Sequence, residues 1–190
     1  MFDEALTAYG VARRVADALA AARIPFAVGG ALAYNYWGAS RGTVDADLNV
    51  FAGLDVFDRV VDALGAIGVD IDRELSRHRV AEGAHAVGHL GEIKVDLFFN
   101  SIPLHDEAAR RTVVVDILGR PAPILSAEDT VLFKLLFFRG KDRVDVERLV
   151  GLQGRTLDRD YIRRWLVDMV GEDDQRVVKW DEICRELPPE

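Results

Sequence analysis

The chain has 190 residues, 49% of them hydrophobic, and a formal net charge of -8 at pH 7. This length and composition suffice for a buried core in one large or two small domains, and the negative charge argues against a protein that coats nucleic acid nonspecifically. The apolar stretches are too short and too charged to span a membrane, and the single cysteine, Cys184, excludes an internal disulfide. We therefore expect a cytoplasmic protein with no secretion signal and no membrane partner.

The first two thirds of the chain alternate predicted helices with predicted strands. Helical spacing of apolar residues predicts helices over residues 3–22, 31–37 and 54–67. β-rich runs predict strands over residues 26–28, 44–51, 77–81, 85–90, 93–99 and 112–118. Because the last four runs follow one another closely, the sheet is expected to be mixed or antiparallel.

The last third of the chain is predicted to be helical. Ser126 is a candidate helix cap, and helices are predicted over residues 127–138, 143–152, 160–170 and 174–186. We therefore predict an α/β (α+β) fold, with a mixed β-sheet flanked by helices in a domain of residues 1–122. A C-terminal helical part of residues 123–190 follows it.

A glycine pair and two carboxylates mark the beginning of the chain. Gly29 and Gly30 follow a predicted strand, where backbone N–H groups can bind phosphate. Asp45 and Asp47 alternate along the next strand and therefore share one face. The chain has three Asp-x-Asp pairs, but only this one lies in a strand-like run after a glycine pair. Two carboxylates on one face suit Mg2+ or Mn2+ bound together with a phosphate substrate.

Asp96 lies within the strongly apolar run Ile93–Phe99. A buried carboxylate needs a cation, so Asp96 is the best candidate for a third metal ligand beside Asp45 and Asp47. The alternative is a salt bridge at the sheet edge, to Lys94 or to an arginine.

Residues 134–164 carry nine Lys and Arg against five Asp and Glu in an otherwise acidic chain. Such a block attracts a polyanion to one place on the protein. The alternative is a set of ordinary solvated helix faces.

Over residues 26–150 the chain resembles the DNA polymerase β-like nucleotidyltransferase superfamily. The resemblance rests on the order glycine pair, Asp45-x-Asp47 and a later strand aspartate, Asp96. Two further elements, Phe133-Lys134-Leu135 and Lys141-Asp142-Arg143-Val144-Asp145, and the hydroxyl of Thr43 resemble the AbiEii/MenT-type toxin branch. The resemblance implies a nucleotidyltransferase-type sheet and transfer of a nucleoside monophosphate from an NTP to a hydroxyl acceptor, with release of pyrophosphate.

The resemblance also implies roles for single residues. Asp45, Asp47 and Asp96 would hold the metal ions, and Lys134 would neutralise the triphosphate. The nucleotide would further contact the residues Gly29, Gly30, Arg41 and Thr43. Asp145 would orient Lys134 or a neighbouring basic residue. The alternatives are a lysine that extends its amine to solvent from a core helix, and an exposed helical carboxylate.

In the toxin branch the acceptor is the 3′ end of tRNA, and an antitoxin protein is the cognate partner. The candidate RNA contacts are Arg139, Lys141, Arg155, Arg159, Arg163 and Arg164. Other acceptors stay open: an antibiotic, or a protein that receives AMP. A nonenzymatic nucleotide-binding module that keeps the fold is the alternative from another class.

Overall fold

The computed structural model describes residues 7–38 and 40–188. The chain divides into two compact units, of which the first consists of Met1–Leu32 and Gly42–Leu125. The second consists of Ala33–Arg41 and Ser126–Glu190. The second unit thus includes residues 33–41 from early in the chain. The predicted domains, 1–122 and 123–190, assign this segment to the first part.

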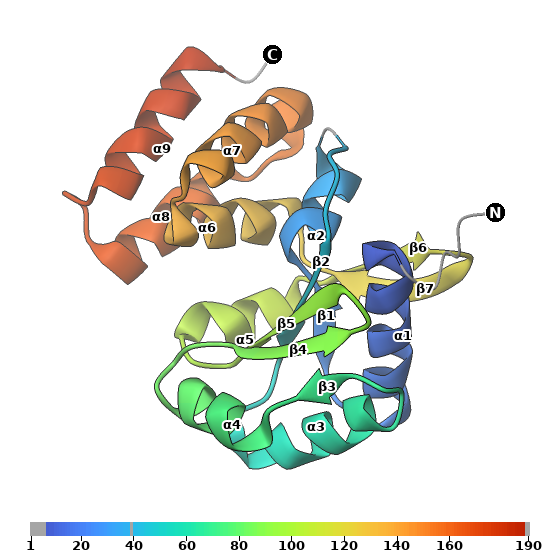
Figure 1. The fold of residues 1–190 in the computed structure, drawn as a ribbon. Coiled ribbons are helices and arrows are strands. Elements are labelled where there is room, and N and C mark those ends of the chain that lie inside the picture. The colour runs from blue at the N-terminus through green and yellow to red at the C-terminus, as the bar shows by residue number, and fades with distance from the viewer. Residues whose placement is uncertain (1–6, 39, 189–190) are drawn as a thin grey trace. The chain divides into compact units, whose positions relative to one another are not determined.

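The first unit contains a seven-stranded mixed sheet in the order β3-β4-β5-β2-β1-β7-β6 (Figure 1). The strands are β1 (Phe26–Val28), β2 (Asp45–Val50), β3 (Asp70–Ile71), β4 (Ala86–Leu90), β5 (Ile93–Phe99), β6 (Val113–Ile117) and β7 (Arg120–Ile124). The central strand, β2, pairs antiparallel with β1 and parallel with β5. The predicted mixed sheet is therefore confirmed.

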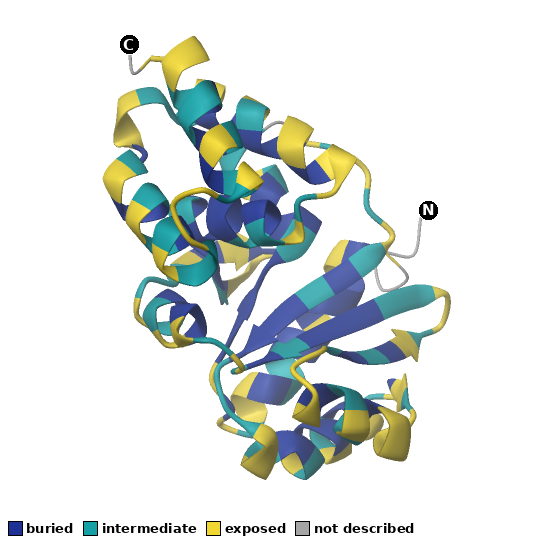
Figure 2. Ribbon diagram, turned by 90° about the vertical axis from the view of Figure 1, so that its left-hand side faces the viewer, coloured by how far each residue is buried: buried dark blue, intermediate teal, exposed yellow. Residues whose placement is uncertain are grey.

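Helices cover this sheet. Those of the first unit are α1 (Ala8–Ala21), η2 (Leu54–Val56), α3 (Phe57–Gly65), α4 (Arg73–Ala81) and α5 (Pro103–Arg110). Helix α1 packs against β1, β2 and β5 and also contacts α3. Figure 2 shows the buried residues concentrated in the strands and in the inner faces of the helices. Of the helix predicted over residues 3–22, residues 3–6 lie outside the described part of the chain.

Strand β2 has one apolar and one acidic face. Ala46, Leu48 and Val50 have no exposed surface, whereas Asp45 and Asp47 alternate with them and point to the other side. Burial of the apolar set therefore fixes the face on which the carboxylates lie.

The strand predicted over residues 77–81 is wrong, because this segment is the second half of helix α4. Asp72 caps this helix by accepting a hydrogen bond from the Leu75 N–H at 3.0 Å. Five residues are too few to separate the periods of helix and strand, and the start of the helix lies upstream of the predicted run.

The sequence-based prediction also omitted β7 and α5. Strand β7 contains Pro121 and Pro123, which lack the N–H groups of a regular ladder and therefore argue against a strand. It pairs along its length with β6 and with β1 only at Val28 and Ile124. Helix α5 has eight residues, too few for a clear apolar period.

The second unit is helical, as predicted. Its elements are α6 (Ala127–Phe137), α7 (Gly140–Gln153), η3 (Gly154–Thr156), α8 (Arg159–Val170) and α9 (Gln175–Glu186). Helix α2 (Gly30–Trp37) begins in the first unit and continues in the second. The hydroxyl of Ser126 caps α6, and Asp158 caps α8, by accepting hydrogen bonds from backbone N–H groups. Helix α6 packs against α7 and α8, and α8 packs against α9.

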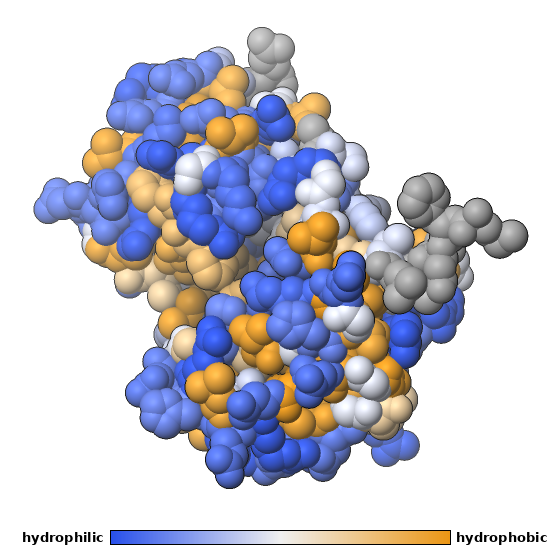
Figure 3. Space-filling view, in the orientation of Figure 1, coloured by the Kyte–Doolittle hydropathy of each residue, from blue (hydrophilic) through white to orange (hydrophobic). Residues whose placement is uncertain are grey.

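Charged and apolar side chains share the surface of the protein. On the face in Figure 3, the α/β unit exposes apolar side chains between hydrophilic ones. None of the helices in the described part of the chain is both long and apolar enough to cross a membrane.

Candidate active site

The pairing of β2 with β5 brings the three predicted metal ligands together in the first unit. In this parallel register Asp47 lies beside Asp96, and Asp45 lies beside Lys94. Asp45 and Asp47 are two residues apart on β2, and Lys94 and Asp96 are two residues apart on β5. All four side chains therefore occupy one face of the sheet. Asp96 is only 5% exposed.

The two oxygens of Asp96 have different surroundings. Lys94 Nζ lies 2.7 Å from Oδ2, so the salt bridge considered as the alternative is present, although β5 lies inside the sheet and not at its edge. Oδ1 is buried and accepts no hydrogen bond from the described residues, and His85 Nε2 lies 3.5 Å away. Burial by itself would raise the pKa of Asp96, but His85 and Lys94 together lower this pKa below its ordinary value.

Asp47 has the opposite tendency. Burial raises the pKa of Asp47, and the nearby carboxylates of Asp96 and Asp45 raise it further. Lys94 and the N–H of Ala31, which donates to Asp47, act against this rise. Burial and the two neighbouring carboxylates therefore favour the protonated form of Asp47.

The glycine pair packs directly on β2. A Cβ added to Gly30 would lie 2.0 Å from Asp47 Oδ2, and one added to Gly29 would lie 2.6 Å from Asn49 Nδ2. The Gly29 N–H donates to the Asp47 carbonyl at 2.9 Å. In this structure the glycine pair thus serves the close approach of β2, which is a contact that the sequence did not predict.

Thr43 stands just before the first aspartate. Its Oγ1 accepts a hydrogen bond from the Asp45 N–H at 3.2 Å. The hydroxyl therefore fixes the entry of the chain into β2, and its predicted contact with a nucleotide stays a prediction.

The donor chemistry of the acidic cluster fits a divalent cation. Carboxylate oxygens are the ligands that Mg2+ and Mn2+ prefer, and among the described residues the buried Oδ1 of Asp96 has only His85 Nε2, at 3.5 Å, as a charged neighbour. Within residues 7–38 and 40–188, no three His, Cys, Asp or Glu residues are arranged to hold a metal ion. Lys94 instead holds one oxygen of Asp96.

In the second unit, Lys134, Asp145 and Arg41 form one network. Lys134 Nζ lies 2.6 Å from Asp145 Oδ2, and the Arg41 guanidinium donates to both oxygens of Asp145 at 2.9–3.2 Å. Lys134 is 6% exposed and Asp145 is 2% exposed. The alternatives of a solvent-reaching lysine and an exposed carboxylate are therefore wrong.

Tyr34 and Asp142 complete this network. Lys134 Nζ lies 4.9 Å and the Arg41 guanidinium 5.6 Å from the centre of the Tyr34 ring, within reach of cation–π attraction. Asp142 lies 3.9 Å from Lys134 Nζ. Burial lowers the pKa of Lys134, and Asp145 and Asp142 act against this effect.

The predicted RNA contacts differ in their surroundings within the second unit. Arg163 forms ion pairs with Asp181 and Glu172, and Arg139 with Asp142. Arg164 lies over the Tyr161 ring, and Lys141 is exposed.

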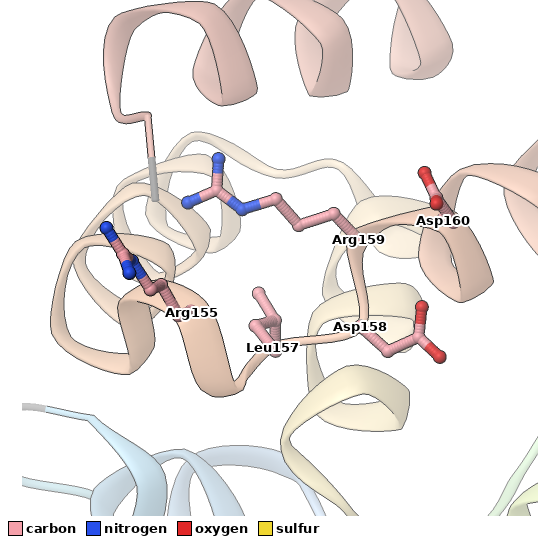
Figure 4. Close-up of a pocket in the computed structure, with 5 residues that line it drawn as sticks. All are labelled: Arg155, Leu157, Asp158, Arg159 and Asp160. Carbon is pink, nitrogen blue, oxygen red and sulfur yellow. The ribbon is translucent and has the colours of Figure 1, made fainter. Parts of the chain in front are cut away.

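Arg155 and Arg159 line a cavity of about 350 Å³ together with Leu157, Asp158 and Asp160. Figure 4 shows both guanidinium groups on one side of this cavity, whereas the two carboxylates point to the other side. Arg159 donates to the Cys184 carbonyl at 3.3 Å, but its Nε and Nη2 atoms are buried and find no hydrogen-bond partner in the described chain. A contact of these two arginines with RNA stays a prediction.

The sequence-based prediction of the site missed Lys94 and His85. Lys94 was considered only as a salt-bridge partner, and His85 was not considered for the site. A signal was nevertheless present, because Lys94 and Asp96 are two residues apart on one strand and must share a face. His85 lies directly before the neighbouring strand β4, and its ring stacks on Phe98 with 4.9 Å between the ring centres.

Solved structures of other proteins share this fold. The solution structure of the antibiotic-resistance factor ANT(2″)-Ia has a TM-score of 0.61 and 14% identity over 85% of this chain and 90% of that chain. A crystal structure of ANT(2″)-Ia in complex with adenylyl-2″-tobramycin has a TM-score of 0.53 and 13% identity over 94% of this chain and 97% of that chain. An antigenic nucleotidyltransferase-like protein from Paracoccidioides brasiliensis has a TM-score of 0.53 and 14% identity over 90% of this chain and 92% of that chain.

The sequence matches no protein-family model and no curated protein. The structural likeness, at these low identities, establishes the fold: the chain has the nucleotidyltransferase fold.

Proposed function

We propose that this chain is a metal-dependent nucleotidyltransferase that transfers a nucleoside monophosphate from an NTP to a hydroxyl group. The observation that carries the proposal is the β2–β5 register, which sets Asp45 and Asp47 beside Asp96 on one face of a sheet with the nucleotidyltransferase fold. The burial of the Asp96 carboxylate, whose Oδ1 accepts no hydrogen bond among the described residues and has only His85 at 3.5 Å, supports a cation at this cluster.

The reaction is a displacement at the α-phosphorus. The acceptor oxygen forms a bond to phosphorus, the bond to the bridging oxygen breaks, and pyrophosphate leaves with that electron pair. Asp45, Asp47 and Asp96 would hold a divalent cation, Mg2+ or Mn2+, which supplies charge neutralisation to the transferring phosphate. The hydroxyl proton passes to a carboxylate of the cluster.

The basic residues of the second unit take the roles of phosphate contacts in this proposal. Lys134 and Arg41 are cations for the nucleotide phosphates, and Asp145 is the positioning residue that holds both of them.

For the acceptor, we propose the 3′ end of tRNA, and for the cellular role, a toxin controlled by an antitoxin protein. The support for a nucleic-acid acceptor is the cavity with the unpaired guanidinium atoms of Arg159 and the neighbouring Arg155. An antibiotic is the second candidate acceptor, because ANT(2″)-Ia, which is similar in fold, has been solved with an adenylylated tobramycin.

The test is a transfer assay with each of the four α-³²P-labelled NTPs and Mg2+ or Mn2+. Total tRNA, a cell protein extract and an aminoglycoside are offered separately as acceptors. We expect label on tRNA with the unchanged chain and none with Asp47→Asn, which replaces a carboxylate by a neutral amide of the same size. Asp70→Asn, in the exposed strand β3, is the matched control and keeps the activity.

The acceptor that carries label decides between the candidates. Label on the aminoglycoside alone or on protein alone would replace tRNA as acceptor and remove the toxin proposal. Nucleotide binding without transfer to any acceptor would favour the nonenzymatic module.

A further inference from the structure

Lys94 lies within the acidic cluster, although no role is assigned to it in the proposed reaction. It faces Asp45 across the β2–β5 pair, and its Nζ lies 2.7 Å from Asp96 Oδ2. Its side chain is 38% exposed, so the ammonium group can reach the cluster or turn away into solvent.

The charges around Lys94 show which groups it balances. Asp96 raises the pKa of Lys94 by hydrogen bonding and by its charge, and Asp45 and Asp47 add to this rise. In return Lys94 acts to lower the pKa of both Asp96 and Asp47. The Lys94 ammonium thus contacts Asp96 and stands beside Asp45, and His85 Nε2 lies 3.5 Å from the other oxygen of Asp96.

The Lys94 ammonium is bound to Asp96, the carboxylate that is proposed as the third metal ligand. Asp96 is 5% exposed, its Oδ2 is bonded to Lys94, and its Oδ1 accepts no hydrogen bond among the described residues. A cation that bound all three carboxylates would lie close to the Lys94 ammonium, and the repulsion between the two positive charges would oppose its binding.

We propose that Lys94 is a positioning residue whose ammonium group holds Asp96 in the absence of a metal ion. A divalent cation then binds the cluster by displacing the Lys94 ammonium from Asp96. This inference rests on the proposed function, in which the cluster binds a metal ion. It assigns Lys94 two effects: it keeps the three carboxylates together before metal binding, and it weakens the affinity for the free cation.

The test is the dissociation constant of Mn2+ for the full chain, measured from the electron paramagnetic resonance signal of free Mn2+. Lys94→Met removes the competing charge and keeps the length of the side chain, so we expect Mn2+ to bind about tenfold more tightly. Lys94→Arg keeps the charge, and its affinity should stay within about twofold of the unchanged chain.

Lys179→Met is the matched control. Lys179 also pairs with carboxylates, Glu147 and Glu182, but lies on α9, and its removal should leave the affinity for Mn2+ unchanged. A second readout is the thermal midpoint: Lys94→Met should lower it without metal, and saturating Mn2+ should raise it more than in the unchanged chain.

Unchanged or weaker Mn2+ binding by a folded Lys94→Met chain would overturn the inference. Circular dichroism verifies the fold, and Lys94→Gln, which keeps a polar group, replaces the methionine variant if that one does not fold. Asp47→Asn separates this inference from the proposed function. If Asp47→Asn abolishes Mn2+ binding and the Lys94 variants do not change it, only the role of Lys94 fails. If neither the unchanged chain nor Lys94→Met binds Mn2+, the metal site itself fails.

Discussion

Gly30 lies directly against Asp47, so closely that a Cβ on Gly30 would be 2.0 Å from Asp47 Oδ2. Gly30 also has φ of +54°, in the left-handed region that side chains disfavour. We expect Gly30→Ala to displace the Asp47 carboxylate and to lower the free energy of unfolding by at least about 2 kcal/mol. Urea unfolding measures the stability, and Mn2+ affinity reports on the carboxylate.

Gly42→Ala is the control for this substitution, because a Cβ at Gly42 meets no atom within 4 Å. It should change stability by less than about 0.5 kcal/mol. Equal effects of the two substitutions would show that Gly30 has no special contact with Asp47.

Asp47 should lower the free energy of unfolding as the pH rises, whereas a carboxylate with a lowered pKa would increase it. Its pKa is raised in the folded chain, mainly by burial, so the folded state holds the proton more strongly than the unfolded state. The stabilising contribution is present at low pH and is lost as the pH rises through the folded pKa. In EDTA, Asp47→Asn should therefore gain stability relative to the unchanged chain as the pH rises from about 3.5 to 7.

Urea unfolding at several pH values measures this difference. Asp70→Asn, at an exposed position, is the control and should retain the pH dependence that is due to Asp47. A stability difference between Asp47→Asn and the unchanged chain that is the same at all pH values would contradict the prediction.

The buried Lys134–Asp145 pair should respond unequally to loss of its two members. Asp145→Asn leaves Lys134 and Arg41 without their shared carboxylate, and we expect a cost of about 3 kcal/mol. Lys134→Met should cost about 1 kcal/mol, because Asp145 keeps Arg41 and a desolvated ammonium is removed.

The double variant should be less destabilised than the sum of the single variants, which a double-mutant cycle from urea unfolding measures. Glu147→Gln, from the partly exposed pair with Lys179, should cost no more than about 0.5 kcal/mol. Strict additivity of Lys134→Met and Asp145→Asn would mean that the pair is not coupled.

His105 on α5 should destabilise the protein in acid. It is 5% exposed, and burial lowers its pKa to about 4 from 6.5. The unfolded chain therefore binds a proton between these values that the folded chain does not, and stability falls by about 3 kcal/mol as the pH drops from 6.5 to 4. His105→Gln, which retains an acceptor for the Ser101 N–H, should remove this part of the pH dependence.

The comparison for His105 is His78, whose side chain is 71% exposed. His78→Gln should retain the fall in unfolding free energy that is due to His105. If His105→Gln also retains this fall, the proton is taken up elsewhere.

Arg155 and Arg159 should contribute to RNA affinity through charge. In fluorescence anisotropy with labelled tRNA, Arg159→Gln should weaken binding and reduce the slope of log affinity against log salt by about 1. Arg155→Gln should act in the same direction. Arg148→Gln removes an equal charge from an exposed position outside the cavity and should have a smaller effect. Equal effects of all three variants would indicate a diffuse electrostatic surface.

Local patterns were sufficient to predict the acidic cluster and most of the elements. Alternation along β2 predicts that Asp45 and Asp47 share one face opposite the apolar residues, and Ala46, Leu48 and Val50 are buried on the other face. The burial of Asp96 was predicted from the apolar run around it, and Asp96 is 5% exposed. The helices from α6 to α9 were predicted because their apolar spacing and caps are encoded within each segment.

Contacts between distant segments were not predictable in this way. Nothing local indicates that Arg41 meets Asp145, which lies 104 residues further along the chain. The same holds for the contact of Gly30 with Asp47, since it depends on the packing of β1 against β2. The chemistry of the residue types indicates which side chains are candidates for the site. Which of these side chains contact one another depends on the tertiary packing.

The parallel pairing of β2 with β5 joins residues about fifty positions apart. A slip of this pairing by one residue would turn Asp47 toward Val95 or Leu97 and bury a carboxylate in the core. The apolar residues Ala46 and Leu48 therefore specify the acidic cluster as firmly as they specify the core. An unfolded or half-folded chain has no such cluster, so affinity for a divalent cation should appear only after the two central strands have found their register during folding.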